Sequence, residues 1–245
     1  ARDALTASAR ALDAPLSWEV HRALAEASML AGRHQRSDEI LDEVLAHTCE
    51  HSQQLDLMAV RTRLRTLQGD HAGAVEGVLE ILPHLGVEVP EDDDAWQAAA
   101  GAELGRIGEL LADRPISTLA SQSAAVEPKI IQRLAALKGI LPITATAPKL
   151  FPLVVGRIVR LSIEHGPTEH SPYGYAMYGL LQVVLGNTAA GDEFGRTALA
   201  LNRAQDLPAL EPPLQQTYGG LICHWRHPYE VALQHAWRAH QGALQ

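Results

Sequence analysis

Four side chains that could bind a transition metal lie close together near the C-terminal end of the chain. Cys223, His224, His227 and His235 are of the residue types that zinc accepts as ligands. His224 and His227, however, flank the end of a predicted helix that stops before Pro228, and no second cysteine lies nearby. We therefore predict solvent-facing or helix-terminal histidines here, with a zinc site as the alternative.

A second cluster of the same kind contains Glu43, His47 and His51, which are spaced by one helical turn. Histidine near the C-terminal end of a helix is favoured by the helix dipole, without any metal. The sequence therefore predicts helix-terminal histidines here too, with a metal site as the alternative.

Motifs for nucleotide binding and catalysis are absent from the sequence. There is no Gly-Lys-Ser or Gly-Lys-Thr of a phosphate-binding loop and no Gly-x-Ser-x-Gly. Gly101, Gly105 and Gly108 have the wrong spacing for a dinucleotide fingerprint. Gly101 and Gly105 are four residues apart and share one face of a predicted helix, so we predict that a neighbouring helix approaches closely there. We predict no catalytic residue and no cofactor, and we do not expect this segment to be an enzyme.

An acidic run between Glu88 and Asp94 holds five carboxylates. A solvated loop is the simplest interpretation of this run. Its last residues, Asp92 to Asp94, also suit the N-cap and first turn of the helix that follows. The alternative is a docking site for a basic partner or a divalent ion, in which Glu91, Asp92 and Asp93 would make the contacts.

Three tyrosines, Tyr173, Tyr175 and Tyr178, fall on one predicted helix beside Met177 and Leu181. Core packing is the favoured interpretation because the neighbouring residues are apolar. The alternative is a groove lined by these rings that would take a small ligand.

The amino-acid composition limits the fold and function classes of the chain. The chain has 245 residues, a net charge of −9, 47% hydrophobic and only 4% aromatic residues, and it holds 38 Ala and 35 Leu. This composition excludes a disordered chain, argues against a β-sandwich or barrel, and disfavours a general nucleic-acid binder. The two cysteines, Cys49 and Cys223, suggest reduced thiols in the cytoplasm, and no apolar run is long enough to span a bilayer.

Apolar residues recur at helical spacing along most of the chain. The first predicted helix begins at the N-cap Ser17 and ends before Gly32, with an apolar face made of Val20, Leu24, Ala27 and Leu30. Further helices are predicted over residues 37–47, 52–68, 72–85, 94–112, 128–141, 148–165, 173–185, 189–204, 213–225 and 229–244.

Helix pairs with similar turns repeat along the chain. The glycines at three of these turns, Gly32, Gly69 and Gly186, are 37 and 117 residues apart, and 117 is three units of 39. A period near 34–40 residues with two helices per unit is typical of tetratricopeptide-like repeats. We therefore predict an all-α, tetratricopeptide-like superhelix of about eleven helices in antiparallel pairs. It would form a single helical-repeat domain over residues 1–245, with an irregular middle section at 86–148.

Five segments occur in a fixed order along the chain: LAEASMLAGRHQRSDEIL (24–41), LGVEVP (85–90), LFPLVVGRIVRLSIEHGPTEHSPYGYAMYG (150–179), GDEFGRTALAL (191–201) and HWRHPYEVAL (224–233). This ordered set resembles the helical, tetratricopeptide-like region of large bacterial multidomain signalling ATPases. In that family a serine/threonine-kinase-like domain and an AAA-type (STAND-class) ATPase module precede the helical region. GAF and histidine-kinase or other output domains follow it.

The resemblance implies a non-catalytic regulatory and protein-interaction scaffold that couples ATPase or kinase modules to an output domain. It also implies that the chain is a piece of a longer, cytoplasmic polypeptide. The expected partners are the other domains of the parent protein, or protein and peptide ligands, rather than nucleic acid or membrane. A small-molecule sensor with a pocket between helices is the alternative. The residues expected at an interaction surface are Arg61, Arg65, Tyr178, Glu91, Asp92 and Asp93.

Overall fold

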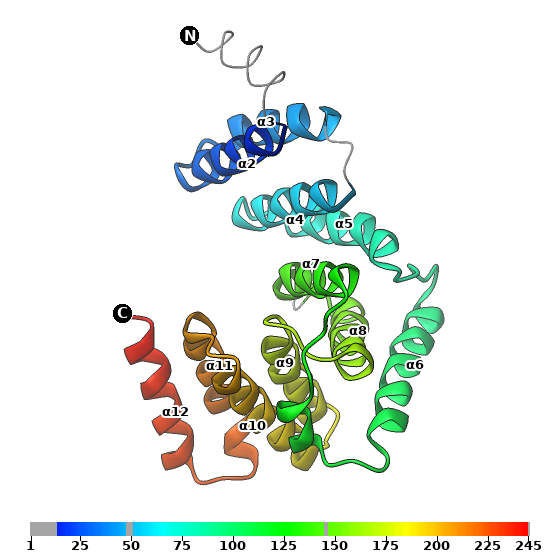
Figure 1. Cartoon of the computed structure of the whole chain (residues 1–245), viewed down its shortest axis with the longest axis vertical. Coiled ribbons are helices and arrows are strands. Elements are labelled where there is room, and N and C mark those ends of the chain that lie inside the picture. The colour runs from blue at the N-terminus through cyan, green and yellow to red at the C-terminus, as the bar shows by residue number, and fades with distance from the viewer. Residues whose placement is uncertain (1–13, 48–50, 145–146, 245) are drawn as a thin grey trace. The chain divides into compact units, whose positions relative to one another are not determined.

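The computed structural model describes residues 14–47, 51–144 and 147–244 (Figure 1). Every regular element in these ranges is helical and none is a strand, which confirms the predicted all-α class. None of the described helices is long and apolar enough to cross a membrane. The chain divides into two compact units, Ala1–Val89 and Pro90–Gln245. A single repeat domain over residues 1–245 stays a prediction.

Unit 1 contains two helix pairs. They are α2 (Ala14–Leu30) with α3 (His34–His47), and α4 (His51–Leu67) with α5 (His71–Ile81), which continues into the 3-10 turn η1 (Leu82–Leu85). The α2–α4 core consists of Ala25, Met29, Ile40, Leu41, Val44, Leu57, Val60 and Leu64.

The buried face of α2 is not its most apolar face. Ala25 and Met29 are buried, whereas Val20, Leu24 and Leu30 are exposed. The small Ala25 lies against α3, where the hydroxyl of Ser37 donates a hydrogen bond to the Ala25 carbonyl oxygen (2.8 Å). Burial on this helix is therefore set by a close helix crossing rather than by the size of the apolar side chains.

Unit 2 has a longer series of helices, from α6 at its beginning to α12 at its end (Figure 1). Helices α6 and α7 contact α8, α8 contacts α9, and α9 contacts α10; α11 and η4 contact α10 and α12. The bounds are α6 (Asp93–Leu111), η2 (Ile116–Ser121), α7 (Pro128–Thr144), α8 (Leu150–His165), α9 (Ser171–Val184), α10 (Thr188–Ala204), η3 (Pro208–Leu210), α11 (Glu211–Thr217), η4 (Tyr218–Ile222), η5 (Cys223–Trp225) and α12 (Tyr229–Gly242).

One predicted helix is not regular. The segment 213–225 is α-helical only to Thr217 and continues as the π-helical turn η4 and the 3-10 turn η5. Within η4, a Cβ on Gly219 would lie 2.5 Å from the Cβ of His235 and 2.9 Å from the carbonyl oxygen of Ala232. The glycine therefore allows η4 to approach α12 closely.

The three predicted turning glycines share one geometry. Gly32, Gly69 and Gly186 have φ angles of 72°, 80° and 87°, a left-handed conformation that favours glycine. At Gly186 the amide donates to Val183 O (2.9 Å) and the next amide, of Asn187, donates to Gln182 O (2.8 Å). The other two turns repeat this pattern of hydrogen bonds, which is that of a Schellman C-cap.

The helix pairs also cross at equivalent positions. The crossing residue of the first helix lies seven residues before the turning glycine in each pair, at Ala25, Thr62 and Gly179. A Cβ on Gly179 would lie 2.8 Å from Gly191 O and 3.2 Å from Gly195 N, so α9 and α10 are in backbone contact. Thr62 lies correspondingly close to Gly77 of α5.

The predicted close helix approach at Gly101 and Gly105 is wrong. A Cβ on either glycine would meet nothing within 4 Å, and the same holds for Gly108. Helix α6 instead contacts α8 through the buried Glu103. One carboxylate oxygen of Glu103 lies 2.7 Å from Arg157 Nε, and the other lies 2.7 Å from Arg160 Nε. The contact with α8 therefore includes an ionic cluster, and Gly156 of α8 lies close to Glu103.

Candidate functional site

The two arginines expected at an interaction surface are engaged within unit 1. Arg61 forms an ion pair with Asp42. Arg65 donates a hydrogen bond from Nη1 to the carbonyl oxygen of Gly73 (2.8 Å), which ties α4 to α5. Both side chains therefore support the helix pairs of this unit, and a role for them in binding stays a prediction.

Tyr178 lies in the core of unit 2, as the packing interpretation predicted, and not on its surface. The side chain is 3% exposed and its ring meets the ring of Phe194 edge-on at 4.7 Å. Burial raises its pKa to about 12. Tyr175 is fully buried and also contacts Phe194 edge-on. These two rings fill the α9–α10 interface instead of lining an open groove.

The acidic run begins unit 2 with a helix cap. Asp92 is the N-cap of α6 and accepts a hydrogen bond from the amide of Ala95 (2.8 Å). Asp93 forms an ion pair with Lys149, and Glu91 is exposed. Two of the three acids therefore have partners within the unit, and a docking role for the run stays a prediction.

A buried carboxylate, which the sequence analysis missed, lies where α10 meets η4. Asp192 is 3% exposed and accepts hydrogen bonds from the Tyr218 hydroxyl (2.7 Å) and from His227 Nε2 (2.9 Å), in the tautomer or charge state that carries a proton there. Its second oxygen pairs with Arg196 Nε (3.0 Å). Burial, followed by the contact with Asp192, raises the pKa of Tyr218 well above its ordinary value, so this hydroxyl stays protonated and donates.

A second set of polar contacts begins at the ring of Tyr218. The Tyr218 ring meets the His235 ring edge-on at 4.8 Å, and His235 Nδ1 hydrogen-bonds to the side-chain oxygen of Gln215. Gln215 Nε2 then donates to Glu211 (2.6 Å). Burial and nearby arginines lower the pKa of His235, so its neutral form is favoured in this position.

The histidines of the C-terminal cluster therefore have separate partners. His227 bonds to Asp192 and His235 to Gln215, while the His224 ring stacks on Tyr229 (6.1 Å between centroids). Across the described ranges, no three His, Cys, Asp or Glu side chains gather as a metal site requires. The side chains of His47 and His51, in the other predicted cluster, lie outside the described residues.

Cys223 is a free and fully buried thiol close to Tyr218 and Asp192. Burial raises its pKa, which disfavours the reactive thiolate. In a Cys49→Ser variant we expect a thiol-specific chromogenic disulfide to modify Cys223 at least ~100-fold more slowly in native buffer than in urea, because the chain must open first. Equal rates in the two solvents would contradict the burial described here.

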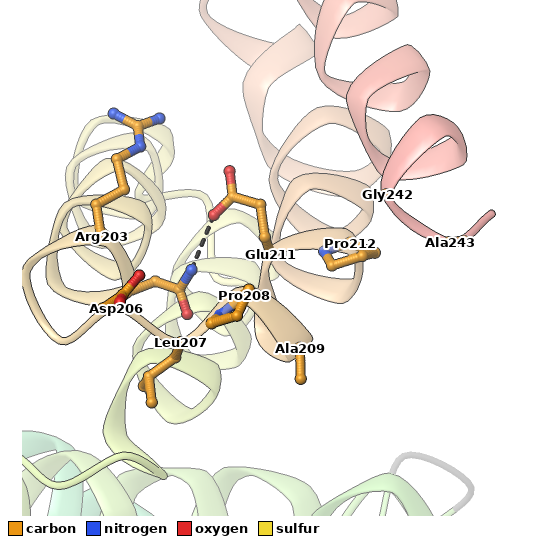
Figure 2. A pocket seen from close by; sticks show the side chains of 10 residues that line it. Arg203, Asp206, Leu207, Pro208, Ala209, Glu211, Pro212, Gly242 and Ala243 are labelled. Carbon is orange, nitrogen blue, oxygen red and sulfur yellow. Dashed lines mark hydrogen bonds between the residues drawn. The ribbon is translucent and has the colours of Figure 1, made fainter. Parts of the chain in front are cut away.

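A cavity of about 630 Å³ lies beside the end of α10, the start of α11 and the end of α12 (Figure 2). Leu207, Pro208 and Pro212 give it apolar walls, and Arg203 and Asp206 lie at its side. The dashed line in Figure 2 is the hydrogen bond from Asn202 Nδ2 to Glu211 Oε2 (2.8 Å). Both oxygens of Glu211 accept internal hydrogen bonds, so this carboxylate stabilises the fold rather than offering itself to a ligand.

A row of large apolar side chains is exposed on α12. Tyr229, Leu233 and Trp237 follow one another at four-residue spacing on one helix face and are 72%, 67% and 62% exposed. Leu221 of η4 is also exposed. A neighbouring face of α12 buries the small residues Ala232 and Ala239. Contiguous exposed apolar side chains of this size mark sites of protein interaction.

Comparison with protein-family models, with curated proteins and with solved structures found no match to this chain.

Proposed function

We propose that this chain is a non-catalytic protein-interaction module of a bacterial signal-transduction protein. It would couple ATPase or kinase modules to an output domain in the cytoplasm. The observation that carries the proposal is the recurrence of one helix-pair arrangement, with the crossing at the same position of the first helix and the same glycine turn.

The spacing of the crossings supports a tetratricopeptide-like repeat. In two of the pairs the residue of the second helix at the crossing lies five positions after the turning glycine, at Ser37 and Gly191, and both are buried. In the α4–α5 pair Thr62 lies against Gly77, eight positions after Gly69. Stacked pairs of this kind present extended surfaces that bind peptides or neighbouring domains. The exposed side chains of α12 provide one such surface.

The test uses the purified chain together with the kinase-like, ATPase and output modules of the polypeptide that carries it. We expect the chain to bind at least one module with a micromolar Kd, which is ordinary for contacts between domains of one protein, and to change its rate of ATP turnover or phosphoryl transfer. Binding is measured by calorimetry and turnover by phosphate release. Neither binding nor an altered rate with any module would contradict the proposal.

A further inference from the structure

We propose that the exposed side chains Leu221, Tyr229, Leu233 and Trp237, together called the α12 seat, bind one amphipathic α-helix with acidic flanks. This inference rests on the proposed interaction role and names the partner class for one surface. It is carried by an equivalent, occupied surface within the same unit.

The equivalence is set by two helix crossings that repeat in register. A Cβ on Gly179 would meet Gly191 O and Gly195 N, and a Cβ on Gly219 would meet Ala232 O and Ala236 N, each at 2.8–3.2 Å. The contacted residues are 41 positions apart, from 191 to 232 and from 195 to 236. Helices α10 and α12 also begin 41 residues apart, at Thr188 and Tyr229. Each residue of α12 can therefore be assigned its counterpart on α10.

The counterpart face of α10 is covered by the next helical segment. Asp192 accepts a hydrogen bond from the Tyr218 hydroxyl (2.7 Å). A Cβ on Gly195 would lie 2.4 Å from the Tyr218 ring and 3.5 Å from the Ile222 side chain. Tyr218 and Ile222 are four residues apart, so η4 presents one helical face to α10.

The same face of α12 carries no such segment among the described residues. The counterparts of Asp192 and Arg196 are Leu233 and Trp237. Asp192 is buried and Arg196 is exposed, whereas Leu233 and Trp237 are both exposed. Residue types at this face have changed from an ionic pair to large apolar side chains. An occupant of this face must therefore be apolar where η4 is polar.

The first helix of each pair provides the same comparison. Leu181 lies two residues after Gly179 and is buried at 4% exposure, whereas its counterpart Leu221, two residues after Gly219, is 46% exposed. Leu181 belongs to α9, which α11 and η4 both contact. A helix that covers Leu221, Leu233 and Trp237 together would thus lie on η4 and α12 as η4 lies on α9 and α10.

Charge indicates the flanks of the occupant. The whole chain has a net charge of −9, yet residues 221–244 contain two arginines, Arg226 and Arg238, against the single acid Glu230. Arg226 and Arg238 are both exposed. Acidic side chains beside the apolar face of the partner helix would pair with them, which sets orientation and association rate.

The probe is an 18-residue, end-capped, fluorescein-labelled peptide with leucines along one helical face and glutamates on both flanks. We expect saturable binding to the whole chain with a micromolar Kd by fluorescence anisotropy. A peptide of the same composition with scrambled leucines should bind about tenfold more weakly, and a lysine-for-glutamate peptide should also bind more weakly at low salt.

The double variant Leu233→Ala/Trp237→Ala tests the seat directly and should raise the peptide Kd about tenfold or more. Leu24→Ala, which removes an exposed leucine of α2, is the matched control and should leave the Kd unchanged. Both variants change exposed side chains, so their thermal unfolding should match that of the unsubstituted chain.

Several outcomes would overturn the inference. They are no saturable binding up to ~1 mM peptide, equal binding of the scrambled peptide, or an unchanged Kd in the double variant. Seat-dependent dimers in sedimentation would assign the seat to a second copy of the chain, and seat-dependent binding to anionic vesicles would assign it to a membrane. If the peptide fails while the signalling modules still bind, only the seat is wrong. If the peptide binds but no module does, the signalling role is wrong.

Discussion

Replacing Gly179 by alanine is expected to lower the free energy of unfolding of unit 2 by about 2–3 kcal/mol. The added Cβ would lie 2.8 Å from the carbonyl oxygen of Gly191 and 3.2 Å from the amide nitrogen of Gly195. Both are backbone atoms of α10, so they cannot move aside as a flexible side chain would. The two helices must separate, and the edge-on contacts of Phe194 with Tyr175 and Tyr178 would loosen with them. Urea unfolding followed by circular dichroism measures the change.

The matched control is Gly105→Ala in α6 of the same unit. A Cβ at this position would meet nothing within 4 Å, so only the helix propensity changes. Alanine should then stabilise the unit by about 0.5–1 kcal/mol. Equal effects at residues 105 and 179 would contradict the close crossing of α9 and α10.

Helix positions could be predicted from the sequence because they depend on local signals. Gly32, Gly69 and Gly186 end their helices in the left-handed conformation that glycine favours, and all three turns lie where the spacing placed them. The long apolar segment at 148–165 is the helix α8, and Val154 and Val159 on its two sides are both buried.

Which face of a helix is buried could not be predicted from apolar side chains alone. The first helix exposes Val20 and Leu24 and buries Ala25, because a close crossing requires a small residue. The same logic misplaced the close approach at Gly101 and Gly105, since a glycine permits contact but does not require a neighbour. Partners from another helix decide both cases, and they are distant in the sequence.

The candidate site was hidden for the same reason. Asp192 and Tyr218 are 26 residues apart, and nothing in their local sequence indicates a buried hydrogen bond between them. The α12 seat was also missed, because Tyr229, Leu233 and Trp237 resemble a core face until the structure shows them exposed. A comparison of α10 with α12 in register would have paired Leu233 with Asp192 and marked this face as different.

Replacing Asp192 by leucine, the residue found at its counterpart position 233, is expected to cost about 3 kcal/mol of stability. The Tyr218 hydroxyl would lose its acceptor at 2.7 Å and His227 Nε2 would lose its partner at 2.9 Å, while Tyr218 stays buried. The loss would come from the unsatisfied polar groups and from the larger side chain of leucine in a buried position. Urea unfolding of the single variant measures it.

A double-mutant cycle with Tyr218→Phe separates this hydrogen bond from the other contacts of Asp192. Tyr218→Phe alone should cost about 1–2 kcal/mol, and the double variant should be about 1–2 kcal/mol less destabilised than the sum of the two single changes. This coupling arises because phenylalanine leaves no hydroxyl that would lack an acceptor beside leucine.

Asp192→Asn retains an acceptor oxygen for Tyr218, and its stability should fall between that of the wild-type chain and that of Asp192→Leu. Strict additivity of Asp192→Leu and Tyr218→Phe would mean that the hydroxyl and the carboxylate do not stabilise η4 on α10 together. The occupied surface used to interpret the α12 seat would then be held by apolar contacts alone.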